Sequence, residues 1–156
     1  MTTSDLSAAK AVIDIAHGVV DRAARGLAAA GNLDDHQVIA YDLAHAAATV
    51  DTGRAMLSYG EKGELEGELT CAYVADAVAE LATKLFGREA LWGVAPDALD
   101  ETRSFVSTYR DPVFLATLAQ RWRMELEPGQ VVEPRPRMTL RPKDAVRMRV
   151  REMVAG

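Results

Sequence analysis

Apolar residues recur at alternating spacings of three and four over three long segments of the sequence, which is the period of one face of an α-helix. The first segment runs from Asp5 to Ala30, where Ser4 can act as the N-cap and Gly31 supplies a stop. The second segment covers 35–60. The third follows a Gly- and Glu-rich turn and ends at Phe86. These patterns predict three long amphipathic helices.

A shorter apolar pattern then predicts a fourth helix that is broken in two, over 97–109 and 112–125. Pro112 follows Asp111 and falls at a first helical position, where its missing N–H group has no helical partner to lose. Short turns between long helices force neighbouring helices to run antiparallel. We therefore predict an all-α protein built as an up-down-up-down four-helix bundle with a broken fourth helix.

The C-terminal part of the sequence has a different composition. Residues 128–142 contain four of the six prolines, which predicts an extended segment. The apolar spacing after it predicts a short further helix that starts at Lys143. The expected organisation is a bundle over 1–127 and, over 128–156, an extended Pro-rich basic tail that serves as a linker to that helix.

Charge and composition narrow the function classes. The net charge is −5, but 129–156 carries seven Lys/Arg and three Asp/Glu, a balance of +4, so the rest of the chain carries −9. An acidic body argues against nucleic acid, whose phosphates need a concentrated basic face. No window has the roughly 18 uninterrupted apolar residues of a membrane span, and the N-terminus lacks a signal-peptide layout. Because the single Cys71 also forms no internal disulfide, we expect a cytoplasmic protein.

Two carboxylate–imidazole pairs raise the alternative of a metal site. Asp14 precedes His17 by three residues, and Asp42 precedes His45 by three, so each pair lies on adjacent turns of a predicted helix. Helical di-metal proteins place a Glu-x-x-His pair on each of two helices. Asp14 and His17 share their face with charged residues that are typical of a solvated surface. We therefore favour surface histidines and expect no metal, with these four residues as the alternative ligand set.

Several short motifs follow one another in the sequence: Asp35-His36-Gln37, Asp42-Leu43-Ala44, Leu85-Phe86-Gly87, Trp92-Gly93 and Tyr109-Arg110-Asp111. Each motif is weakly specific by itself, since Ala-rich helices resemble one another. Their order resembles the C-terminal helical domain of the acyl-CoA dehydrogenase flavoenzymes over roughly residues 20 to 120. The resemblance implies the same helical fold.

The sequence departs from the family pattern where the chemistry lies. The family's catalytic glutamate is replaced by Ala119, which cannot accept a proton. The glycine-rich turn that approaches the flavin is replaced by 84–89, and Arg25 stands one position away from the family's phosphate-binding arginine. We therefore expect no catalytic residue. The candidates for flavin contact are Arg25, Trp92, which can instead plug the end of the bundle, and Arg110, which can instead pair with a carboxylate of the second or third helix.

The resemblance implies a non-catalytic helical domain that packs against, or extends, a flavin-dependent acyl-CoA dehydrogenase module, in cis or as a partner subunit. The chain alone is expected to hold no cofactor and show no activity. Completed by such a module, it would belong to an oxidoreductase that uses FAD on CH–CH bonds, and we expect an oligomer. Two alternatives remain open: the catalytic helical half of a divergent FAD-dependent dehydrogenase, and an independent metal- or small-ligand-binding bundle.

Overall fold

The computed structural model describes residues 4–31, 34–131, 134–135, 141–142 and 147–153 of the chain. The described part is mostly helical, with a few short strands, so the prediction of a largely helical protein is confirmed. The contacts between residues divide the chain into two compact units, a helical unit (residues 1–115) and a C-terminal unit (residues 116–156). None of the helices in the described ranges is both long and apolar enough to span a bilayer.

Helix α1 (Leu6–Ala30) begins and ends at specific capping residues. The Asp5 carboxylate accepts a hydrogen bond from the Ala8 N–H group at 2.8 Å, so Asp5 and not the predicted Ser4 is the N-cap. Ser4 instead packs against Gly67, where an added Cβ would lie 2.7 Å from the Ser4 Oγ atom. Gly31 ends the helix in the left-handed conformation (φ 77°), as predicted.

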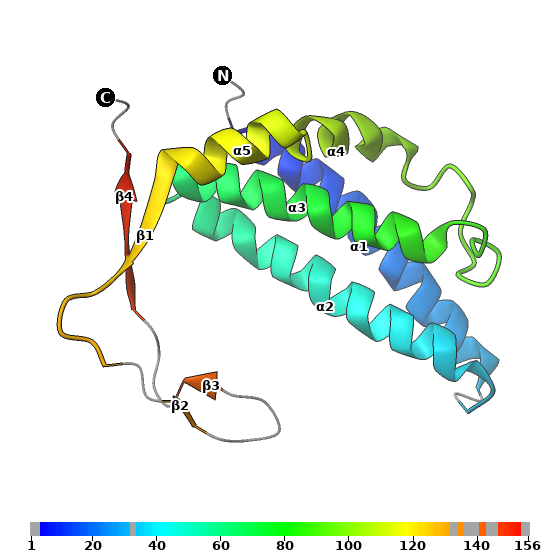
Figure 1. Cartoon of the computed structure of the whole chain (residues 1–156). Coiled ribbons are helices and arrows are strands. Elements are labelled where there is room, and N and C mark those ends of the chain that lie inside the picture. The colour runs from blue at the N-terminus through cyan, green and yellow to red at the C-terminus, as the bar shows by residue number, and fades with distance from the viewer. Residues whose placement is uncertain (1–3, 32–33, 132–133, 136–140, 143–146, 154–156) are drawn as a thin grey trace. The chain divides into compact units, whose positions relative to one another are not determined.

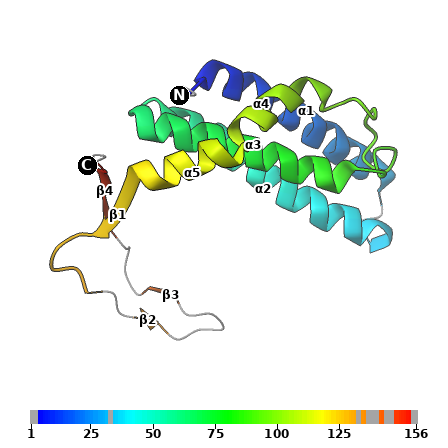
Figure 2. The same ribbon diagram turned by 45° about the horizontal axis from the view of Figure 1, so that its top comes forward.

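Helices α2 (Gln37–Gly60) and α3 (Glu64–Leu85) follow, with a single 3₁₀ turn η1 (Asp34–His36) before α2. Helix α3 begins inside the stretch that the sequence predicted as a turn. Its first turn carries the acidic residues Glu64 and Glu66, whose charges are favourable at the positive end of a helix dipole. Consecutive long helices run antiparallel, and α1, α2 and α3 contact one another along their lengths (Figures 1 and 2).

The predicted fourth helix is broken, as expected, but its boundaries differ. A 3₁₀ turn η2 (Asp100–Thr102) leads into α4 (Arg103–Tyr109), which packs on α3 and α1. Helix α5 (Pro112–Arg121) then starts anew, because the Asp111 carboxylate accepts hydrogen bonds from the Val113 and Phe114 N–H groups at 2.9 and 3.2 Å.

The C-terminal unit corrects two predictions. The second half of the fourth helix ends at Arg121 instead of reaching Glu125, because strand β1 (Trp122–Leu126) follows at once. The predicted last helix is strand β4 (Met148–Glu152) over its described part, and its start at Lys143 lies outside the described residues. Both segments alternate polar and apolar positions with period two, which is a strand pattern.

Strands β1 and β4 form a two-stranded antiparallel sheet, with Met124 opposite Val150 at the centre of the register. A second, two-residue pairing joins β2 (Pro134–Arg135) and β3 (Arg141–Pro142), inside the stretch predicted to be extended.

The helical core is built on close helix approach. Fully buried side chains come from all three long helices and from the loop after α3, and the largest are Trp92, Ile13, Leu81, Val50, Val74 and Val78. Small residues let α2 come close to its neighbours: a Cβ added at Gly53 would lie 2.8 Å from the Ile13 Cδ1 atom, and one added at Gly60 would lie 2.8 Å from the Thr70 Oγ1 atom. These two glycines of α2 therefore fix the spacing of α2 to α1 and α3.

Two glycine substitutions are expected to have opposite effects. Gly18 lies exposed in the middle of α1 with no atom within 4 Å of an added Cβ, so Gly18→Ala should raise the free energy of unfolding by about 0.5–1 kcal/mol. Gly53→Ala gains the same helix propensity, but the added methyl group displaces the Ile13 side chain. We therefore expect the free energy of unfolding to fall by about 1 kcal/mol. Urea unfolding of the two variants measures both values; a gain for Gly53→Ala would contradict the close approach of α1 and α2.

Candidate functional site

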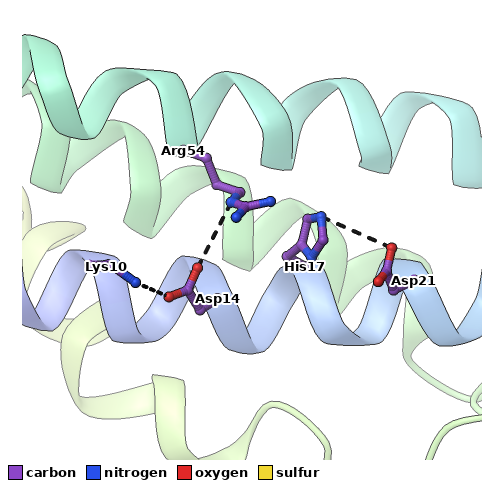
Figure 3. Close-up of polar contacts among 5 residues, drawn as sticks. All are labelled: Lys10, Asp14, His17, Asp21 and Arg54. Carbon is purple, nitrogen blue, oxygen red and sulfur yellow. Dashed lines mark hydrogen bonds and ion pairs between the residues drawn. The ribbon is translucent and has the colours of Figure 1, made fainter.

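The polar face of α1 forms a row of ion pairs, which Figure 3 shows together with Arg54 of α2. The carboxylate of Asp14 pairs with Lys10 and, at 3.8 Å, with Arg54. The His17 Nε2 atom lies 4.0 Å from the Asp21 Oδ1 atom. The Asp14 and Asp21 side chains are 40% and 50% exposed, so this row is a solvated surface whose pairs each contribute little to stability.

In the second carboxylate–imidazole pair, Asp42 and His45 likewise each contact a different residue. The Asp42 Oδ2 atom accepts a hydrogen bond from the Arg88 Nη1 atom at 2.8 Å, and the Asp42 side chain is only 20% exposed. The His45 ring instead lies against Tyr41, with ring centroids 4.4 Å apart. Within the described ranges, no group of three or more His, Cys, Asp or Glu side chains is placed to share a metal ion. Both carboxylates of the alternative ligand set, on Asp14 and Asp42, face cationic side chains.

The three candidates for flavin contact do not form a common site. Arg25 is a 74% exposed side chain that pairs with Asp21 at 3.6 Å on the outer face of α1. Trp92 lies in the loop after α3 and is 1% exposed, so its ring belongs to the core and is not available for stacking on a ligand. Arg110 follows α4 and pairs with Asp76 of α3 at 3.2 Å.

The Arg110–Asp76 pair is the contact that the sequence predicted between the fourth helix and a carboxylate of the second or third helix. It joins the end of α4 to α3. The two side chains are 50% and 72% exposed, so solvent screens the pair and its net contribution to stability is small. The apolar contacts of Phe105 and Tyr109, both buried, therefore hold α4 in place.

A buried polar cluster joins the start of α1 to the end of α4, and sequence reasoning missed it. The Tyr109 hydroxyl group accepts a hydrogen bond from the Asp5 N–H group at 3.0 Å, across 104 residues of sequence. It also interacts with the Cys71 thiol of α3, which is fully buried. No local pattern indicates such a contact, since Tyr109 reads in the sequence only as part of a Tyr-Arg-Asp motif.

Burial keeps both acidic groups of this cluster protonated. It raises the pKa of Tyr109 from 10.0 to about 12, with the neighbouring Cys71 adding to the effect. Burial also raises the pKa of the Cys71 thiol above its ordinary value. Because the thiolate is the reactive form of cysteine, Cys71 is a packed thiol and not a nucleophile at neutral pH. The cluster is a structural element of the helical unit.

Two concave regions lie at the end of the helical unit where α2 begins and α3 ends. A groove of about 470 Å³ runs between α3, the following loop and α4, and it is lined largely by apolar side chains, Phe86 and Leu99 among them. A second groove of about 610 Å³ brings Val38 of α2 and Leu91 of the loop to one surface.

Four large exposed apolar side chains lie on the first turns of α2 and on the segment after α3. They are Val38 (72% exposed), Tyr41 (67%), Phe86 (86%) and Leu91 (68%), which we call the end surface. Val38 and Tyr41 come from the first turns of α2, whereas Phe86 and Leu91 follow α3. Val38 and Leu91 line the second groove and Phe86 lines the first, so both grooves carry a large exposed apolar side chain.

Comparisons with protein-family models, with curated protein sequences and with solved structures returned no match to this chain.

Proposed function

We propose that this chain is a non-catalytic helical domain of the acyl-CoA dehydrogenase type, which packs against or extends a FAD-dependent acyl-CoA dehydrogenase module. The end surface is the observation that carries the proposal. Four large apolar side chains, each more than two-thirds exposed, come from two helix ends of one unit. A domain whose role is packing needs such a surface, since apolar area removed from water drives association.

The helix arrangement supports the family part of the proposal. Helices α1, α2 and α3 run antiparallel, and α4 packs on α1 and α3, which supports the proposed up-down-up-down bundle. Two helix ends lie in segments that carry the resemblance: α3 ends at Leu85 of Leu85-Phe86-Gly87, and α4 ends at Tyr109 of Tyr109-Arg110-Asp111.

The contacts of the candidate flavin-binding residues support the proposal that the domain is non-catalytic. Arg25 and Arg110 each pair with a carboxylate of the helical unit, and Trp92 is buried in the core. Ala119 replaces the family's catalytic glutamate and cannot take a proton from a thioester substrate. We infer that FAD and substrate are held by the partner module, and that this chain contributes surface to the assembly.

The test is binding of the purified chain to the purified acyl-CoA dehydrogenase holoenzyme of the same organism, measured by sedimentation velocity. Phe86→Asp and Leu91→Asp place a charge in the end surface and should weaken the complex about tenfold or more. Val131→Asp is the matched control, because Val131 is 79% exposed outside the helical unit and should bind unchanged. Absence of a complex, or equal binding by all three variants, would contradict the proposal.

A further inference from the structure

We propose that the outer edge of strand β1, where Met124 lies, pairs with the same edge of a second copy of this chain, forming a four-stranded sheet in the order β4–β1–β1–β4. The inference concerns the C-terminal unit alone and does not depend on the function proposed for the helical unit. It rests on the hydrogen-bond register of β1 and on the order of its charges.

The register shows which backbone groups of β1 face outward. The Met153 N–H group donates to the Arg121 carbonyl at 2.7 Å, and the Glu127 N–H group donates to the Arg147 carbonyl at 3.2 Å. Odd-numbered residues of β1 therefore direct their backbone groups to β4, and Met124 and Leu126 direct theirs to the outer edge. Since the sheet has two strands in the described part of the chain, no described strand covers this edge.

A two-stranded sheet of five residues a strand is marginally stable by itself in water, and an open edge is a template for another strand. This two-stranded sheet of β1 and β4, which we call the ribbon, also leaves apolar side chains exposed, with Leu126 at 50% and Met148 at 46%. Both features indicate that the ribbon acquires a further strand.

The charges of β1 specify a second copy as that strand. A two-fold axis through Met124 aligns two β1 strands antiparallel, so that Arg123 of each copy faces Glu125 of the other and Trp122 faces Leu126. The outward backbone groups of Met124 fall in a hydrogen-bonded pair in this register. The Arg123–Glu125 pairs then take the non-hydrogen-bonded positions, where side chains come closest.

Neighbouring registers are disfavoured by the same charges. If the register shifts by two residues in one direction, Glu125 of one chain lies opposite Glu125 of the other. If it shifts in the other direction, Arg123 of one chain lies opposite Arg123 of the other. The edge of β4 is unsuited to self-pairing, because an axis through Val150 brings Arg149 opposite Arg151. The β1 edge thus has one register that is self-complementary over all five residues.

The second copy also offers Arg123 a different carboxylate partner. Arg123 lies opposite Arg151 in the β1–β4 register, a like-charge pair that is unfavourable. Both guanidinium groups approach the single Glu125 carboxylate, at 3.5 and 3.2 Å. In the paired state the Glu125 carboxylate of the other copy lies beside Arg123, so Arg123 can pair across the two copies while Arg151 keeps the Glu125 of its own chain.

The experiment compares Arg123→Glu, Glu125→Lys and their equimolar mixture by sedimentation equilibrium. The unmodified chain should form a dimer of about twice the 16.9 kDa chain mass. Each single variant places like charges opposite each other and should dissociate about tenfold or more readily. In the mixture, the introduced glutamate faces the introduced lysine and the native pair is kept, so dimers should reappear.

Arg22→Glu is the control, because it makes the same charge change on the exposed face of α1 and should leave the dimer intact. Recovery in the mixture also shows that both variants are folded at the strand edge. A monomeric unmodified chain, species larger than a dimer, single variants that still dimerise, or a mixture that stays monomeric would each overturn the proposal.

Discussion

Replacing Trp92 with alanine is expected to lower the free energy of unfolding of the helical unit by about 3–5 kcal/mol. The Trp92 side chain is 1% exposed and belongs to the same buried cluster as residues of α1, α2 and α3. Its removal leaves a cavity that helices held by their own backbone hydrogen bonds cannot fill by collapse. Urea unfolding followed by circular dichroism measures the loss.

Trp92→Phe is the matched control. The Trp92 Nε1 atom has no hydrogen-bond partner within the described part of the chain, so loss of this N–H group should carry no penalty. The phenyl ring keeps most of the apolar contact, and a loss of only about 1–2 kcal/mol is expected. A loss as large as that of the alanine variant would show that Nε1 is bound in solution, and a small loss for Trp92→Ala would contradict its place in the core.

Replacing Tyr109 with phenylalanine is expected to lower the free energy of unfolding by about 1–3 kcal/mol at neutral pH. The ring packing against Phe105 and Phe114, with centroids 4.6 and 5.3 Å away, would remain. The hydroxyl group would be lost, which leaves the Asp5 N–H group without the acceptor that ties α1 to α4. Thermal unfolding at neutral pH measures this cost.

The Tyr109 contribution should also depend on pH, with a defined sign. The pKa of the Tyr109 hydroxyl group is about 12 in the folded chain, whereas its ordinary value of 10.0 applies to the unfolded chain. The unfolded chain therefore loses this proton first as the pH rises. The stabilisation is complete below about pH 10 and is lost between about pH 10 and 12. The gap between the native chain and Tyr109→Phe should therefore narrow by about 1 kcal/mol between about pH 8 and about pH 11. A gap that widens over this range would contradict the burial of the hydroxyl group.

The helices could be predicted from the sequence because local periodicity determines them. The alternation of three- and four-residue spacings gave α1, α2 and α3, and the Asp111-Pro112 step gave the break before α5. The segments 122–126 and 148–152 were predicted as helical because apolar residues at helical spacings continue into both, but both form strands, as their period-two alternation indicates. That alternation was present in the sequence and identifies both strands.

The contacts of the polar residues were harder to predict from the sequence than the helices. Arg110 was predicted to pair with a carboxylate of the second or third helix, and the structure provides Asp76. By contrast, the Arg88–Asp42 and Tyr109–Asp5 contacts join residues 46 and 104 positions apart, and only the packed fold brings them together. The packing of the helices, which no local pattern encodes, thus determines which polar groups meet.

We propose that this chain supplies a packing surface and neither holds flavin nor performs the dehydrogenase reaction. Titration of the purified chain with FAD, followed by flavin fluorescence and then by acyl-CoA addition, is the decisive test. We expect no saturable change in fluorescence and no bleaching of the flavin absorbance by acyl-CoA. Binding of one FAD per chain, with bleaching on addition of acyl-CoA, would contradict it.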